Sequence, residues 1–286
     1  MRIRTGDFIS GCLVLLTAVA CALPARGQDT QMMPEQSAAK AKQLLHEAIE
    51  ALGGAAYLHL HDATCTGRLS QFGHSGELMG YEKFIDYAIP PNMDRNENLP
   101  KRNIIEVING DHGWVLDRGG VTDAPEDAIK QNLDDQKVDI DNLLRSRINE
   151  PGMVFRYKGP DVVDLKESDW VEIEDPDGRN IQIALAKATH LPIRKVVTLR
   201  DPQTSLRIEE TEYYSNYHPI EGVMTPFQIA RDRNGQKIFQ AWIDECKYNT
   251  GISPDLFTKE SLDARWAVVG KKEIKKQEKE RKKVND

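Results

Sequence analysis

The sequence has few cysteines: four in 286 residues, of which only Cys65 and Cys246 lie beyond residue 27. Neither belongs to a Cys-x-x-Cys pair, and two cysteines alone cannot complete a structural zinc site, which argues against a small zinc module. An even pair is compatible with one disulfide in an oxidising compartment. The sequence leaves two states equally open, a Cys65–Cys246 disulfide and two buried thiols.

An overall basic charge is also missing, since 38 basic residues stand against 45 acidic ones for a net charge of −7. Loss of an N-terminal leader containing Arg2, Arg4, Arg26 and Asp7 would make it −9. The C-terminal tail, residues 271–286, carries eight basic and four acidic residues, which leaves about −13 on the body. Such a body is unsuited to nucleic acid. The tail is typical of a solvated charged helix, and peripheral membrane contact is its alternative.

Long apolar runs are scarce, and the one clear run lies at the N-terminus. Arg2 and Arg4 precede an apolar stretch, Ile9–Leu23, and the small residues of Ala25-Arg26-Gly27 follow it. This is the layout of a secretory signal peptide, with cleavage expected before Gln28. The sequence therefore predicts residues 1–27 as a signal peptide and a mature protein outside the cytoplasm.

Two alternatives to a cleaved leader stay open. A retained membrane anchor would need about 20 apolar residues, whereas this run is shorter and is interrupted by Ser10 and Gly11. Lipidation of Cys21 is the other alternative, because Ala18-Val19-Ala20-Cys21 loosely resembles a lipobox, although it lacks the usual leucine. No later segment is apolar enough to span a bilayer.

Catalytic and phosphate-binding motifs are missing as well. The helical segment 46–50, His-Glu-Ala-Ile-Glu, is half of a zinc signature without an evident third ligand. Gly73-His74-Ser75-Gly76 is one residue short of a nucleophile elbow and fits a hairpin turn better. Gly-rich phosphate loops do not occur. We therefore predict a protein that is not an enzyme and that has no catalytic residue, no metal site and no cofactor.

An acidic cluster occupies the segment after Pro125. It lacks the glycine at the sixth position of a calcium loop, and we interpret it as a solvated helix face; its members are Asp134, Asp135, Asp139 and Asp141.

Two helical regions are expected. Ser37 is a good N-cap for an amphipathic helix that runs to Leu52, and Gly53-Gly54 supplies its C-terminal stop. Residues 125–149 have mostly helical apolar spacing among many charges, and Pro151-Gly152 closes that segment. Each helix has an apolar face that needs a partner surface.

Most of the remaining chain reads as short strands separated by turn residues, such as Asp175-Pro176-Asp177-Gly178 and Asn234-Gly235. The expected strands are 64–70, 78–89, 104–108, 113–117, 153–157, 170–174, 181–185, 193–200, 206–214, 224–231 and 237–247. This pattern predicts a continuous antiparallel meander and argues against a doubly wound α/β fold. We expect an α+β, mainly β, fold with one domain over residues 28–270.

Aromatic residues within the expected strands are the candidate ligand-binding residues, because a curved sheet can use such side chains to line an apolar cavity. Core packing is the alternative for each of them. The candidates are Trp114, Trp170, Trp242 and Phe227.

Four segments resemble the periplasmic outer-membrane lipoprotein-sorting (LolA-like) family. Asn109–Trp114 is similar to the family's Asp-Gly-x-x-x-Trp stretch, and Thr189–Arg194 to its late Leu-Pro turn. Tyr214–Pro226 and Asn249–Phe257 resemble its later strands and its closing Leu-Phe turn. The resemblance covers roughly residues 40–258.

The resemblance implies an incomplete antiparallel barrel around helices, with an apolar cavity that holds lipid or lipoprotein acyl chains in the periplasm. An envelope protein-interaction or assembly module on the same scaffold is the alternative function. The chain departs from the family at one point: an Arg-Pro pair near the end of an early strand is replaced by Tyr87–Asn92, which has no arginine before its prolines. Arg95 is displaced from that position, so the family's arginine role is not carried over to it.

Overall fold

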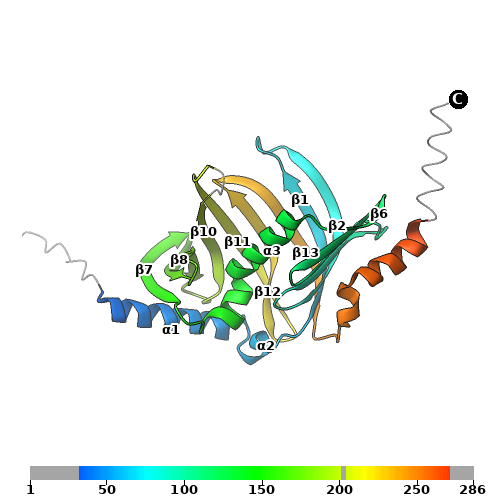
Figure 1. Cartoon of the computed structure of the whole chain (residues 1–286). Coiled ribbons are helices and arrows are strands. Elements are labelled where there is room, and N and C mark those ends of the chain that lie inside the picture. The colour runs from blue at the N-terminus through cyan, green and yellow to red at the C-terminus, as the bar shows by residue number, and fades with distance from the viewer. Residues whose placement is uncertain (1–31, 201–203, 271–286) are drawn as a thin grey trace, which may run out of the picture. The chain divides into compact units, whose positions relative to one another are not determined.

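The computed structural model describes residues 32–200 and 204–270 (Figure 1). The chain divides into two units, Met1–Met32 and Met33–Asp286, and the fold described below is that of the second. The predicted signal peptide and the tail 271–286 lie outside the described residues, so both stay predictions. Within the described residues, none of the helices combines the length and apolar character that a membrane crossing requires.

A 13-stranded antiparallel sheet forms the framework, in the order β6-β5-β4-β3-β2-β1-β13-β12-β11-β10-β9-β8-β7. We call β1–β6 the N-terminal wing and β7–β13 the C-terminal wing. Each wing is a meander of neighbours in sequence, and the two wings join where β1 pairs with β13. Because the two edge strands, β6 and β7, do not pair with each other, the sheet stays open. The expected mainly β, antiparallel fold is confirmed.

The strands of the N-terminal wing are β1 Ala63–Phe72, β2 Leu78–Ile89, β3 Met93–Leu99, β4 Ile105–Asn109, β5 His112–Asp117 and β6 Gly120–Asp123. Those of the C-terminal wing are β7 Val154–Val163, β8 Lys166–Glu174, β9 Asn180–Ala186, β10 Pro192–Arg200, β11 Arg207–Ile220, β12 Val223–Arg233 and β13 Gln236–Tyr248.

Helix α1 (Pro34–Leu52) packs on β7 and β8 (Figure 1). Its buried stripe forms the main core together with Val171, Ile173, Ile181 and Ile183 of the C-terminal wing, and it comprises Ala41, Leu44, Leu45, Ala48, Ile49 and Leu52. We call the face of the sheet that carries this core the inner face. Burial of this apolar stripe is what holds α1 on the sheet.

The predicted N-cap at Ser37 is wrong, because α1 begins at Pro34, whose fixed φ suits the first helical turn. The Ser37 hydroxyl instead contacts the edge strand β7, accepting a hydrogen bond from the Tyr157 N–H at 2.9 Å. The predicted stop at Gly53 is confirmed: its φ of 132° suits glycine, and a Cβ there would lie 2.4 Å from the Gly222 carbonyl oxygen. The short helix α2 (Ala55–Leu58) follows.

The predicted helical insertion comprises α3 (Glu126–Val138), α4 (Ile140–Asn142) and the π-helical turn η1 (Leu143–Arg147). Figure 1 shows α3 lying across the middle strands of the sheet. Leu143 and Leu144 are buried in the main core, so the insertion covers the inner face.

A second core lies on the opposite, outer face of the N-terminal wing. Ile105, Val107 and Leu116 pack there against Phe257 and Leu262. These last two residues come from the short 3-10 helix η2 (Pro254–Phe257) and from a helix that covers residues 259–270. The C-terminal segment therefore closes the outer face of this wing.

A buried ion cluster fixes this second core. Arg95 and Glu97 are 3% and 0% exposed, and their Nε and Oε1 atoms lie 2.6 Å apart. Arg102 contacts the other oxygen of Glu97. Arg95 also donates to the Leu256 carbonyl at 2.7 Å and to the Ser261 hydroxyl at 2.8 Å. Arg95 thus ties the C-terminal segment to β3.

Candidate ligand cavity

A cavity of about 640 Å³ lies between the inner face and the helical insertion. Its walls come from both wings, from α2 and from the insertion. The apolar part includes Phe84, Val138, Ile140, Val197, Val223, Ile229, Phe239, Ala241 and Ile243. These residues alternate along β10, β12 and β13 with residues that point away, which is how an antiparallel sheet builds one apolar wall.

An ion network crosses the inner face at the back of this cavity. Lys195, Glu212 and Arg231 occupy one register row of β10, β11 and β12. Glu212 lies 2.8 Å from the Lys195 Nζ and 2.6 Å from an Arg231 nitrogen, and it accepts a hydrogen bond from the Tyr214 hydroxyl. Burial raises the pKa of Glu212, but the charges of Lys195 and Arg231 lower it to about 2.

The same network attaches the helical insertion to the sheet. Lys195 donates to the Val138 carbonyl at 2.9 Å, and Arg231 lies 3.8 Å from Asp135. Sequence analysis missed these residues as site components. The available signal was charge at inward-facing strand positions, because Lys195 shares its face with the buried Val197.

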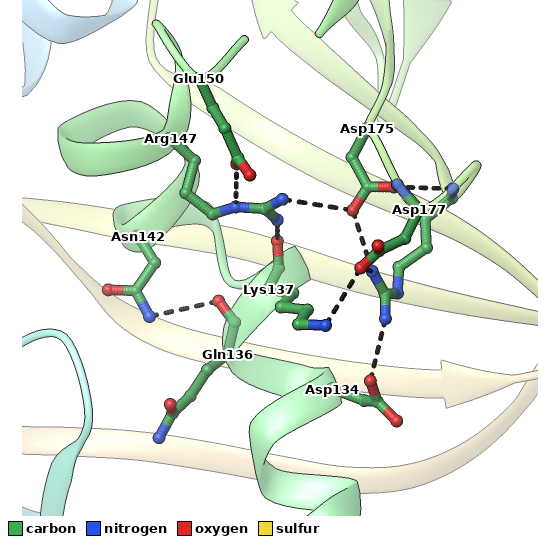
Figure 2. A network of polar contacts seen from close by, with 9 residues as sticks. Asp134, Gln136, Lys137, Asn142, Arg147, Glu150, Asp175 and Asp177 are labelled. Carbon is green, nitrogen blue, oxygen red and sulfur yellow. Dashed lines mark hydrogen bonds and ion pairs between the residues drawn. The ribbon is translucent and has the colours of Figure 1, made fainter. Parts of the chain in front are cut away.

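A second polar cluster holds the other side of the insertion (Figure 2). Arg147 of η1 lies 2.7 Å from Glu150 and 3.4 Å from Asp175, which belongs to the predicted turn after β8. Lys137 of α3 lies 3.0 Å from Asp177 of the same turn. Asp175 also accepts backbone N–H bonds within the turn. The insertion is thus anchored to the C-terminal wing at two places.

The cavity wall also carries carboxylates that form no ion pair with a basic side chain in the described part of the chain. Asp86 of β2 and Asp94 of β3 line it on the N-terminal wing, while Asp139 and Asp141 line it from the insertion. Burial raises the pKa of Asp86 to about 6, and burial together with the Asp86 charge raises the pKa of Asp94. Burial and the Asp141 charge raise the pKa of Asp139 to about 6. These are the shifts expected where charged groups lose water.

The interpretation of the acidic cluster as a solvated helix face is therefore wrong for Asp139, whereas Asp141 is exposed. Asp139 caps α4 by accepting from the Asn142 N–H at 2.9 Å, and Asp141 accepts from the Tyr57 hydroxyl at 2.6 Å. Helical periodicity could not reveal this, because the α4 turn brings these residues over the inner face. Asp134 instead pairs with Arg179 at 2.9 Å.

None of the four predicted aromatic residues is among the residues that line this cavity. Trp114 packs in the second core, where it pairs in register with Val107 on the outer face. Trp170 packs beside Ala184 and Ile193, outside the main core. Strand alternation turns both rings away from the cavity, because their neighbours Val107 and Ala184 belong to the other face.

Phe227 and Trp242 lie elsewhere on the C-terminal wing. Phe227 contacts the His218 ring edge to face, with centroids 4.7 Å apart. Trp242 pairs in register with Arg68 and Gln228, while its neighbour Ala241 lines the cavity. The structure does not bring the four aromatic residues together in one site.

Cys65 and Cys246 form a disulfide in the structure. They are register partners at the junction of β1 and β13, where the two wings meet, and both line the cavity. In the part of the chain that the structure describes, no cluster of three or more His, Cys, Asp or Glu side chains could hold a metal ion.

No protein-family model and no curated relative matches this sequence. Three solved structures have similar folds. A DUF1329 family protein from Desulfovibrio piger ATCC 29098 is 13% identical, with a TM-score of 0.57, over 78% of this chain and 98% of that one. A candidate outer membrane lipoprotein-sorting protein domain from Vibrio parahaemolyticus is 12% identical, with a TM-score of 0.52, over 79% and 99%.

The third structure is a LolA superfamily protein, NE2245, from Nitrosomonas europaea. It is 14% identical, with a TM-score of 0.50, over 78% of this chain and 99% of that one. At such identities the similarity concerns architecture alone, since one fold can carry several functions. The open antiparallel sheet, the inner helices and these three structures together show that this chain has a LolA-like fold.

Proposed function

We propose that the chain is a non-enzymatic envelope protein whose inner cavity holds the apolar part of a lipid or of a lipoprotein. The observation that carries the proposal is the cavity of about 640 Å³, with apolar walls from both wings. That volume falls in the range of small-molecule binding sites. The fold similarity to a LolA superfamily protein and to a candidate lipoprotein-sorting domain supports the same proposal.

The proposed location is the periplasm, with export by the N-terminal leader. The supporting observations are the signal-peptide pattern of residues 1–27 and the pairing of Cys65 with Cys246, since disulfides persist in oxidising compartments. N-terminal sequencing of the exported protein should begin at or near Gln28. A lipidated N-terminal Cys21 would instead make the protein a lipoprotein.

Displacement of a fluorescent fatty acid tests the binding proposal. Delipidated wild-type protein should take up the probe, and Ile229→Glu should weaken uptake by at least about tenfold, because a carboxylate placed in the apolar wall has to lose water. Ile104→Glu is the matched control: Ile104 is 40% exposed and does not line the cavity. Its uptake should equal that of the wild type.

Thermal melts of both variants separate lost binding from lost folding. Absence of uptake by folded wild-type protein would contradict the proposal and favour the envelope interaction module. Native mass spectrometry of protein purified gently from the envelope would then show whether a protein partner is bound in place of a lipid.

A further inference from the structure

The charged groups along the cavity wall are unequal in number. Seven carboxylates line it, against three basic side chains, Arg145, Lys195 and Arg231. Lys195 and Arg231 are engaged by Glu212, and Arg231 also by Asp135. Arg145 donates to the Leu60 carbonyl and lies over the Tyr57 ring. Within the wall, Lys195 and Arg231 therefore already have carboxylate partners, whereas Arg145 has none among the described residues and its buried Nε has no hydrogen-bond partner.

Four of the carboxylates have no ion-pair partner among the described residues: Asp86, Asp94, Asp139 and Asp141. Asp86 accepts a hydrogen bond from the Asn96 amide at 3.2 Å, and the two insertion residues accept from a backbone N–H and from a phenol. The Asp94 carboxylate has neither a hydrogen bond nor an ion pair with any other described residue. Its nearest influences are repulsive, because the charges of Asp86 and Glu106 both disfavour its ionisation.

Unpaired carboxylates that lose water, as Asp86 and Asp94 do, are costly to a fold, and proteins usually pair such groups or leave them on the surface. The outer face of β3 shows the usual solution, where Glu97 has two arginine partners. On the inner face the partner is missing, and the cavity provides space for one. A cation brought by a ligand would meet this need.

We propose that the ligand is an amphiphile with a cationic amine group, an inference that rests on the proposed function. The Asp86–Asp94 pair on β2 and β3 receives the amine, and the apolar wall around Val197, Ile229 and Ile243 holds the chain. A primary ammonium has three donors for carboxylate oxygens, and Asp94 has free acceptors facing the cavity. An anionic head group would instead meet the surplus negative charge of the wall.

Binding of such a ligand depends on pH through the pair's charge. Besides the pair itself, the charged groups around the cavity are Glu106 from β4, Asp135, Asp139, Asp141 and Arg145 from the insertion, and Lys195, Glu210, Glu212 and Arg231 from the C-terminal wing. Because burial raises the pKa of Asp86 to about 6, the pair is mostly protonated below that pH. Affinity for an ammonium should therefore increase as the pH rises from about 5 to 7.

Three probes with one dodecyl chain test the inference by calorimetry below their micelle concentrations: dodecylammonium, dodecanoate and dodecyl maltoside. Wild-type protein should bind dodecylammonium at least about tenfold more tightly than either of the others. Asp86→Asn with Asp94→Asn should abolish that preference while retaining dodecyl maltoside binding. Asp111→Asn with Asp123→Asn is the charge-matched control, because both residues are exposed and lie outside the cavity wall. It should keep the preference.

The outcomes separate the two proposals. Equal binding of the three probes, or a preference that the Asp86→Asn/Asp94→Asn variant retains, would overturn the amine proposal and leave the apolar carrier intact. Binding of none of the probes by folded protein would overturn the carrier function itself. A preference that does not change between about pH 5 and 7 would show that the pair is not the receiving group.

Discussion

The two faces of β3 differ in whether their charged side chains have ion-pair partners. On the outer face, Arg95 and Glu97 are almost completely buried and fully paired, and they hold the C-terminal segment in place. On the inner face, Asp94 lines a cavity and has no cationic partner among the residues that the structure describes. The adjacent residues Asp94 and Arg95 therefore differ in role. The buried charge of Arg95 has a partner and fixes packing, whereas the Asp94 carboxylate at the cavity wall is open to the proposed ligand.

Loss of the Cys65–Cys246 disulfide should have the largest effect on stability. The disulfide joins the N-terminal wing, which contains β3, to β13. The two cysteines are separated by 181 residues. Replacing both by alanine should reduce the free energy of unfolding by up to about 4–5 kcal/mol by chain-entropy estimates. Urea unfolding of this variant and of oxidised wild type measures the difference. Two reactive thiols per unfolded, unreduced wild-type chain would show that the bridge does not form.

Removal of the charge at Glu97 should come next in size. Glu97→Gln leaves Arg95 buried without its carboxylate, which should cost about 3 kcal/mol. Burial raises the pKa of Glu97, but hydrogen bonds from Arg102 and Arg95 lower it below its usual value. The contribution of Glu97 is thus present above about pH 4.5 and is lost as the pH falls further. Urea unfolding at about pH 7 and pH 3 measures both effects.

A paired change of Arg95→Met with Glu97→Leu is the control for that prediction. Replacing both members of a buried ion pair with apolar groups is often nearly neutral. A loss as large as that of Glu97→Gln alone would show that the hydrogen bonds from Arg95 to Leu256 and Ser261, and not its unpaired charge, dominate the cost.

The inner face should show the opposite sign and the smallest effect. Asp86→Asn with Asp94→Asn should stabilise the ligand-free protein by about 1–2 kcal/mol at about pH 7, since ionised buried carboxylates oppose folding. Because the pKa values of Asp86 and Asp94 are raised, the folded wild type binds more protons than the unfolded chain. The difference in free energy of unfolding between the wild type and the double variant should therefore vanish as the pH falls to about 4. Urea titrations over this pH range, with Asp111→Asn as control, measure the slope. A destabilised double variant would contradict the comparison.

The sequence predicted elements that have one apolar face. Strand β2 was expected at residues 78–89, the bounds that it has, and the insertion was expected as helical. Strand β3 was missed because its buried positions hold Arg95 and Glu97, which no hydrophobic pattern marks. The helix over residues 259–270 was also missed, and with it the cover over Trp114.

The site could be predicted less well than the fold. The candidate aromatic residues lie in expected strands, but the inward or outward direction of each ring depends on strand register and on which face a distant segment covers. Trp242 and Ala241 are neighbours, and the alanine lines the cavity. The carboxylates Asp86 and Asp139 lie on separate elements, and local patterns carry no information about such distant neighbours. The choice between a disulfide and free thiols likewise depended on the β1–β13 register.

The junction of β1 with β13 also constrains when this protein becomes functional. All other paired strands are neighbours in sequence, so each wing can form from local contacts as the chain emerges. The junction must wait for β13, near the end of the chain, and closing so long a loop is the slow, entropically costly step of assembly. Because Cys65, Ala241, Ile243 and Cys246 all line the cavity, the cavity is complete only at that final step. The protein therefore acquires its cavity last, once almost all of its chain is available for folding.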